Sequence, residues 1–181
     1  KNNYQTILTR EPGGTKNGER IRNLILKDYF SFGKKEKLDK YSDTLLYLAA
    51  RNEHILNKVK PSLNNKKIVI CDRFIDSTLA YQVYGKKVDS KFVKFIHKYV
   101  LNGVKPDLTF LLTVKINKAI KRLKKRKNLN RYDKFPKKFY IKAQRDFIRI
   151  AKKNKKKYII LDSSENNSNL FAYICLNCRY W

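Results

Sequence analysis

The chain has 181 residues, of which 42% are hydrophobic, and this size and composition suit one globular domain with a sizeable core. Its formal net charge is +28, because 43 Lys and Arg residues face only 15 Asp and Glu residues. No apolar run approaches the roughly 18 residues of a membrane span, and the first residues lack the apolar region of a secretory leader, so we expect a cytoplasmic protein.

Short apolar segments alternate with segments of helical periodicity along the chain. Strands are expected at residues 4–9, 68–71, 108–114 and 158–161. Helices are expected at residues 18–28, 42–63, 77–84, 90–101, 118–127 and 136–153, with a last helix after residue 164. Ser42 is the expected cap of the second helix, and Asp89 or Ser90 that of the fourth. The alternation predicts an α/β fold, in which one parallel sheet is covered by helices on both faces, and one domain over residues 1–181.

A loop with an unusual sequence follows the first expected strand: residues 9–15 read T-R-E-P-G-G-T. Pro12 fixes the loop, and the two glycines let the backbone approach a ligand closely. Arg10 supplies a donor for a phosphate. Gly13 and Gly18 have the spacing of a phosphate-binding loop, but Glu19 follows where Lys is required, so we reject that interpretation.

Asp72 and Arg73 directly follow the second expected strand. A carboxylate at this place can hold Mg²⁺, and the guanidinium beside it can bind a phosphate through two hydrogen bonds. Loops at the carboxyl ends of adjacent parallel strands converge on one crevice, so this pair and the first loop are expected to meet. The simpler alternative is a strand-end ion pair without chemistry.

Two further groups of residues are candidates for a nucleotide site. Tyr47 and Arg51 lie four residues apart on one helical face, where a ring and a guanidinium can hold a base and its phosphate. The alternative is a Tyr at the edge of the core beside a solvated Arg. Arg131 lies in a polar loop after a helix carrying Arg122 and Arg126, and such a loop can cover a transferring phosphoryl group or be a solvated run of charge.

In order and spacing, these motifs resemble the bacterial thymidylate kinase family. The resemblance covers nearly the whole chain to about residue 165. The matching segments are T-R-E-P-G-G-T (9–15), L-L-Y-L-A-A-R (45–51), D-R-F (72–74), S-T-L-A-Y-Q (77–82), K-P-D-L-T (105–109), R-Y-D (131–133, with Asp133 for Glu) and the aromatic residues Phe139, Tyr140 and Phe147.

The resemblance implies a P-loop nucleoside monophosphate kinase fold and transfer of a phosphoryl group from ATP to dTMP, with Mg²⁺. Tyr47 would stack on thymine, and Arg51 would contact the base or its phosphate side. Arg10 and Arg73 would hold the dTMP phosphate, and Asp72 would position Mg²⁺. The residues implied to line the substrate site are Arg10, Glu11, Pro12, Tyr47, Arg51, Arg73, Ser77, Thr78, Tyr81 and Gln82. Arg126 and Arg131 would approach ATP from a lid at about residues 126–136, and the family implies a homodimer.

The chain departs from the family pattern at both ends. The family's first strand and phosphate loop would precede Lys1, and they are absent from this sequence. That strand is central in the family's sheet, so its loss would leave two strands without a hydrogen-bonding partner between them. We therefore expect this chain to fold poorly or to bind ATP weakly. Residues 174–181 do not resemble the family's closing helix.

Other functions stay open at this point. One is a related kinase for another nucleotide, although Arg10, Arg51 and Arg73 favour an acceptor that carries a phosphate. Another is a basic nucleic-acid-binding protein without catalysis, which the charge favours. Lys is spread along the whole chain, often beside Asn, Ile, Tyr and Phe, which is the composition that AT-rich codons produce. This favours compositional drift over a dedicated nucleic-acid surface as the origin of the charge. A metal or redox role for Cys175 and Cys178 is also weak, since His54 and His97 lie far away in sequence, and Cys71 reads as a core residue.

Overall fold

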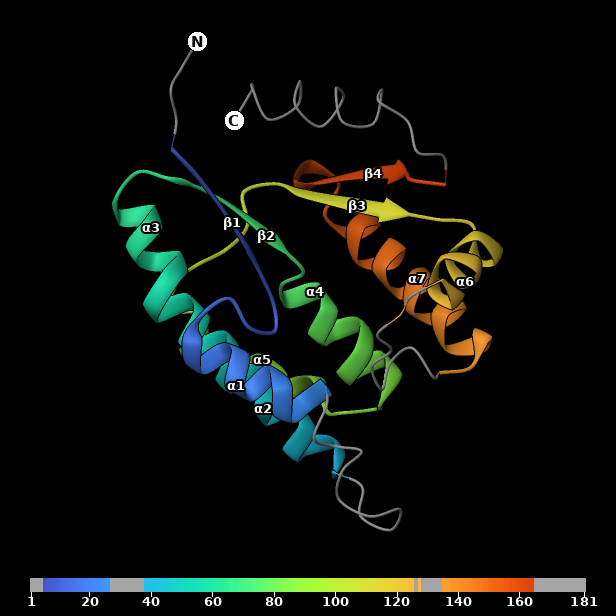
Figure 1. Ribbon diagram of the computed structural model, residues 1–181, viewed down its shortest axis with the longest axis horizontal. Helices are drawn as coiled ribbons and strands as arrows, with labels where there is room; N and C mark the ends of the chain where they lie inside the picture. Colours follow the sequence, from blue (N-terminus) through green and yellow to red (C-terminus); the bar gives the residue numbers. More distant parts are fainter. Residues whose placement is uncertain (1–4, 27–37, 126, 128–134, 165–181) are drawn as a thin grey trace. The chain divides into compact units, whose positions relative to one another are not determined.

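The computed structural model describes residues 5–26, 38–125, 127 and 135–164 (Figure 1). The chain forms two compact units, Lys1–Lys105 and Pro106–Trp181. Each unit combines parallel strands with helices, which confirms the predicted α/β class. The prediction of a single domain stays a prediction.

The sheet of the first unit consists of two parallel strands, β1 (Thr6–Arg10) and β2 (Ile68–Asp72). Thr6 pairs with Ile68 at one end, and Arg10 pairs with Asp72 at the other. Both strands are short and rich in β-branched and apolar residues. Alternate residues of each are nevertheless exposed, among them Leu8, Ile68 and Ile70, so the predicted cover of both faces by helices is wrong for this sheet within the described residues. The two polar motifs therefore leave the sheet side by side, at the same edge.

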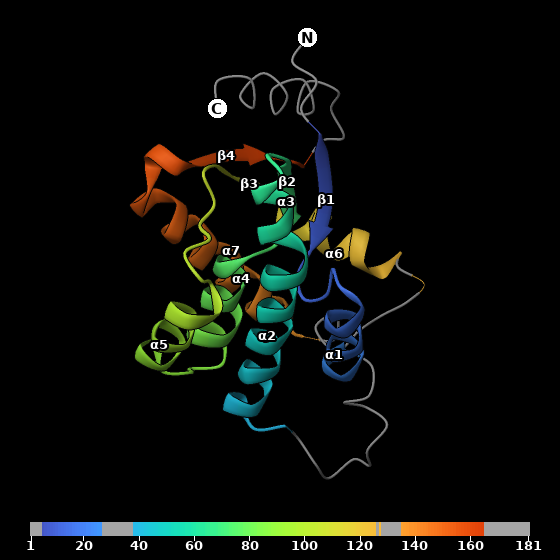
Figure 2. The same ribbon diagram turned by 90° about the vertical axis from the view of Figure 1, so that its left-hand side faces the viewer.

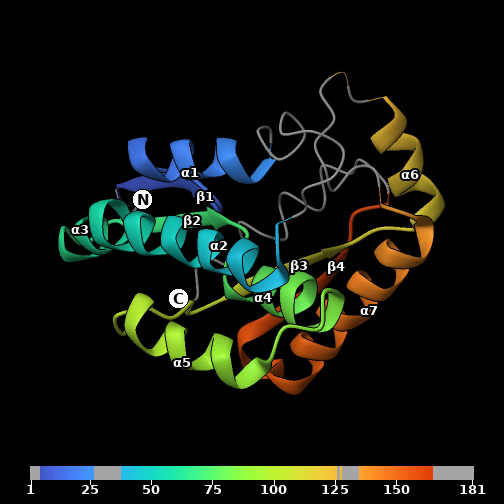
Figure 3. The same ribbon diagram turned by 90° about the horizontal axis from the view of Figure 1, so that it is seen from below.

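Between these strands the chain is helical. The helix α1 (Lys16–Leu26) packs against α2 (Lys40–His54), as Figure 3 shows from below. A π-helical turn, Ile55–Val59, and α3 (Lys60–Asn64) continue α2 to one residue beyond the end predicted from the sequence. The predicted cap at Ser42 is wrong, because α2 begins two residues earlier. Asp39 caps it by accepting a hydrogen bond from the Tyr41 backbone N–H.

After β2 come the short helix α4 (Ile75–Thr78), a π-helical turn at Leu79–Gly85, and α5 (Ser90–Val100). Asp89 caps α5, as predicted, by accepting a hydrogen bond from the Lys91 backbone N–H. The helix α5 packs against α2 (Figure 2). Val93 of α5 forms a small core with Val83 and Val88, and the partly buried side chains packed against this core are Tyr41, Leu79, Tyr84 and Phe92.

The second unit has its own pair of parallel strands, β3 (Thr109–Thr113) and β4 (Tyr158–Asp162). Two helices complete it: α6 (Ile116–Lys124) and α7 (Lys137–Lys153), the second of which packs against both strands. The helix α7 begins just after Pro136, which stands at the capping position and not within the first turn as predicted. No helix in the part of the chain that the structure describes is long and apolar enough to cross a membrane.

Within the described residues, β2 pairs only with β1, and β3 pairs only with β4. A strand that pairs on one edge leaves backbone N–H and C=O groups on its other edge without ladder partners. The predicted consequence for folding and ATP binding stays a prediction.

Candidate active site

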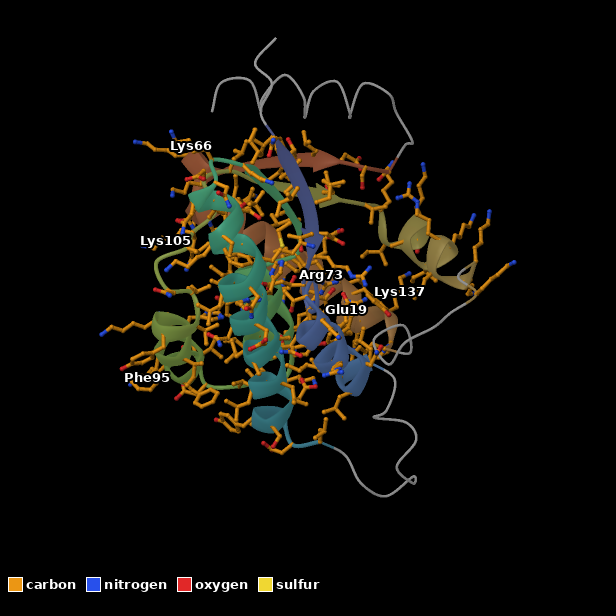
Figure 4. All side chains as sticks on the ribbon, turned by 60° about the vertical axis from the view of Figure 1, so that its left-hand side comes forward. Glu19, Lys66, Arg73, Phe95, Lys105 and Lys137 are labelled. Atoms are coloured by element: carbon orange, nitrogen blue, oxygen red, sulfur yellow. The ribbon has the colours of Figure 1, made fainter. Side chains whose placement is uncertain are left out.

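The two motifs predicted to converge lie together at the end of the β1–β2 sheet. Arg10 is the register partner of Asp72, and the Glu11 backbone N–H donates a hydrogen bond of 3.0 Å to the Asp72 carbonyl oxygen. Figure 4 labels Arg73 and Glu19 at the end of β1 that carries the loop. The parallel register thus brings residues 62 positions apart in sequence to one place.

The loop after β1 curls around the carboxylate of Glu19. Its two glycines, Gly13 and Gly14, have φ angles of 119° and 84°, which side-chain-bearing residues rarely adopt. The Gly14 backbone N–H donates to the Glu19 carboxylate at 3.0 Å, and Arg10 Nη2 lies 3.0 and 3.1 Å from its two oxygens. Burial alone would raise the pKa of Glu19, but these contacts lower it overall. A carboxylate occupies the loop, which supports rejecting a phosphate-binding loop here.

A buried ion pair joins this loop to α2. Arg51 Nε and Nη2 each lie 2.7 Å from Glu11 Oε2, and the two side chains are only 3% and 5% exposed. Burial acts to raise the pKa of Glu11, but the Arg51 charge and hydrogen bonds from His54 and Arg51 outweigh it and lower that pKa. The solvated Arg of the simpler sequence interpretation is therefore wrong. Arg51 is among the most buried polar residues of this unit.

Two histidines complete the network around the ion pair. His54 Nδ1 lies 3.2 Å from Glu11 Oε1, and His54 Nε2 lies 2.7 Å from Thr9 Oγ1. Because an ionised carboxylate only accepts, Nδ1 carries a hydrogen towards Glu11, while Nε2 and the Thr9 hydroxyl share a second hydrogen bond. On the other side, Arg51 Nη1 lies 2.7 Å from His97 Nε2 and donates to Thr78 Oγ1 at 2.9 Å. Glu11 and Arg51 are thus held from both sides.

The segment after β2 supplies the remaining predicted residues of this unit. Arg73 has a φ of 69°, and its guanidinium carbon lies 4.8 Å from the centre of the Tyr81 ring. Thr78 and Gln82 are buried, whereas Ser77 and Tyr81 are half-buried. Cys71, before them, is half-buried and donates from Sγ to the Arg73 carbonyl oxygen; burial raises the pKa of its thiol to about 12.

Sequence analysis missed Arg22. Its Nη1 donates to the Pro12 carbonyl oxygen at 2.7 Å. Burial and the positive charge of Arg10 lower the pKa of Arg22, and Tyr47 and Arg73 are among the other groups that act on it. Glu19, whose Oε2 lies 3.9 Å from Arg22 Nε, acts in the opposite direction, so the three arginines and the half-buried Tyr47 share this region with a carboxylate. The available signal was helical spacing, since Arg22 lies between the buried Gly18 and Ile25 on one face of α1.

Asp72 is exposed at the end of β2. The described residues contain no group of three or more His, Cys, Asp or Glu side chains that could hold a metal ion. Mg²⁺ keeps much of its water and binds substrate phosphates, so one or two carboxylates are enough for it. A lone exposed carboxylate beside arginines fits Mg²⁺ bound with a nucleotide, and does not fit a metal caged by protein ligands.

The residues predicted for a lid are only partly described. Arg126, Arg131, Cys175 and Cys178 lie outside the described residues. Arg122, on α6, donates from Nη2 to the carbonyl oxygens of Ser163 and Ser164 at 3.0 and 3.2 Å. Arg122 thus ties α6 to the end of β4 within the second unit.

Comparisons with known proteins show which family the chain belongs to. A family model for thymidylate kinase matches residues 1–174. The thymidylate kinase of Ehrlichia chaffeensis is 43% identical over 160 residues, which are 88% of this chain and 73% of that protein. That of Staphylococcus haemolyticus is 37% identical over 164 residues, or 90% and 77%. A crystal structure of thymidylate kinase from Ehrlichia chaffeensis superposes with a TM-score of 0.66 at 38% identity, covering 87% of this chain and 74% of that one. The chain belongs to the thymidylate kinase family.

Proposed function

We propose that this chain phosphorylates dTMP with ATP, giving dTDP and ADP, and that its first unit holds the dTMP site. The observation that carries the proposal is the meeting of Arg10, Asp72 and Arg73 at the end of the β1–β2 sheet, next to the buried pair of Glu11 and Arg51. Membership of the thymidylate kinase family supports the reaction.

Arg10 and Arg73 are proposed to bind the dTMP phosphate. Arg73 extends from a strand end and stacks against Tyr81, and this contact limits where its guanidinium can lie. Arg10 is exposed and paired with Glu19, so it exchanges one anionic partner for another when a phosphate arrives. In phosphoryl transfer, the protein lowers the barrier mainly by aligning the two phosphates and compensating their charge.

The base and sugar are proposed to lie over the middle of α2. Tyr47 offers a ring for stacking, one helical turn before Arg51. Three of the five Arg51 N–H groups donate to Glu11, Thr78 and His97, and a fourth faces Glu11 from Nη2. The fifth, also on Nη2, is the donor proposed for the base. The remaining residues proposed for this pocket are Glu11, Pro12, Ser77, Thr78, Tyr81 and Gln82.

Asp72 is proposed to hold Mg²⁺, directly or through water, beside the reacting phosphates. When bound, the ion neutralises charge on the phosphate oxygens. Arg126 and Arg131 are proposed to approach the ATP phosphates from the lid. A homodimer and a cytoplasmic location belong to the same proposal, and their support is the family resemblance and the nucleotide chemistry.

A basic nucleic-acid-binding protein is the second candidate, and the charge of +28 favours it. Binding of that kind weakens steeply as salt increases, because condensed counterions are released. Binding of dTMP involves a single phosphate group, so few counterions are released and the dependence on salt is much smaller. Titrations of DNA and dTMP at low and high salt therefore separate the two functions.

The proposed phosphate site is tested by comparing dTMP with thymidine in calorimetry. Two arginines that hold a phosphate predict that dTMP binds at least about 100-fold more tightly, because hydrogen bonds to charged groups contribute about 1.5–3 kcal/mol each. Arg73→Ala removes much of that difference, whereas Arg145→Ala, an exposed arginine of α7, leaves it unchanged. Equal affinities of a folded chain for dTMP and thymidine would overturn the assignment.

A further inference from the structure

We propose that His97 is a positioning residue, which accepts a hydrogen bond from Arg51 and so holds that guanidinium in the orientation that receives dTMP. This inference rests on the proposed function, because it concerns the dTMP site. The proposal is based on the contact between His97 Nε2 and Arg51 Nη1, which lie 2.7 Å apart where helices α5 and α2 pack together.

The chemistry of the two partners fixes the state of His97. A guanidinium has N–H donors and no acceptor, so His97 Nε2 must present its lone pair to Arg51. In a neutral imidazole the hydrogen then lies on Nδ1. A protonated His97 would direct an N–H at the Arg51 N–H, and the two groups would repel each other. His97 can hold Arg51 only as this neutral tautomer.

The surroundings keep His97 neutral. Burial lowers the pKa of His97 to about 4, and the positive charge of Arg51 on α2 acts in the same direction. Glu11, in the loop after β1, acts in the opposite direction and is outweighed. Thr78 on α4 shares the Arg51 Nη1 atom and carries no charge. At neutral pH the imidazole is therefore an acceptor, as the geometry requires.

His97 and Thr78 together account for both hydrogens on Arg51 Nη1, while Glu11 faces Nε and Nη2. The guanidinium is planar, so directing one nitrogen sets the directions of the others. The remaining N–H of Nη2 then points in one direction only. Loss of the His97 acceptor frees the plane to turn, and leaves a buried N–H of a charged group without a partner.

The test uses a matched pair of substitutions in the full chain. His97→Leu has similar bulk and no acceptor, whereas His97→Gln reaches about as far as Nε2 and presents a carbonyl oxygen. Lys98→Gln, exposed on the same helix, is the control. In dTMP calorimetry near neutral pH, His97→Leu is expected to weaken binding about tenfold or more. His97→Gln should restore most of the affinity, and Lys98→Gln should bind as the original chain does.

A purely structural role for His97 predicts a different outcome: His97→Leu lowers thermal stability while dTMP affinity stays unchanged, and this would overturn the proposal. A chain that binds no dTMP at all would overturn the proposed function, and the positioning role with it. If His97→Leu does not fold, ¹⁵N NMR of the unaltered chain decides, because only two histidines have to be assigned. An unprotonated Nε2 on His97 supports the proposal, and a protonated Nε2 refutes it.

Discussion

The buried pair of Glu11 and Arg51 predicts a large loss of stability for Glu11→Gln. The substitution keeps the shape of the side chain and removes its charge. The Gln carbonyl oxygen can still accept from Arg51 Nε, and its amide can still meet His54 if that ring changes tautomer. The change therefore isolates the charge from the packing.

The magnitude follows from burial. Arg51 is 3% exposed and both its Nε and Nη2 lie 2.7 Å from Glu11 Oε2, so water cannot replace the lost carboxylate. Removing one partner of a buried ion pair costs about 3–5 kcal/mol, because the other charge remains buried without compensation. We expect the lower part of this range, about 3 kcal/mol, because the hydrogen bonds survive.

Urea denaturation measures this loss as a lower midpoint at an unchanged slope. Glu19→Gln is the matched control: Glu19 also pairs with an arginine, at 3.0 Å, but the two side chains are 53% and 38% exposed. The control should lose about 1 kcal/mol or less, as exposed pairs do. Equal losses for both variants would show that burial of the charge does not set the cost, and would refute the reasoning.

Two more predictions follow from the same geometry. His97 has a pKa of about 4 in the fold against 6.5 normally, so its contribution to stability is fully present above about pH 6.5 and is lost as the pH falls towards 4. The free energy of unfolding should fall by about 3 kcal/mol over this pH range. Urea denaturation at several pH values should show a smaller fall for His97→Gln than for the unaltered chain. Gly14→Ala should lower the thermal midpoint, because φ is 84° and a Cβ would lie 2.7 Å from His54 Cδ2 and Thr9 Oγ1; an unchanged midpoint would contradict the account of the loop.

Much of the backbone could be predicted from local sequence. Short apolar runs gave the strands, and their order gave parallel pairing, because a strand followed by a helix returns in the same direction. The cap of α5 at Asp89 could also be predicted from the neighbouring residues alone. The start of α2 was predicted wrongly at Ser42: Asp39 also carries a capping side chain, and it is Asp39 that accepts the hydrogen bond at the start of the helix.

The candidate site was predictable only in part. Arg10, Asp72 and Arg73 follow strands, so parallel pairing alone brings them together. The burial of Arg51 depends on Glu11 and His97, which lie 40 and 46 residues away in sequence. Neither partner is related to Arg51 by helical or strand spacing, and only the packing of α2, α5 and the loop after β1 reveals the contacts.

The proposed function depends on selective binding of dTMP by the first unit. Calorimetric titration with dTMP, with dUMP, dCMP and dGMP as competitors, tests it most directly, with circular dichroism to establish that the chain is folded. The account predicts binding of dTMP in preference to the competitors, and its loss in Arg73→Ala. A folded chain that binds none of these nucleotides, or binds all of them equally, would contradict it.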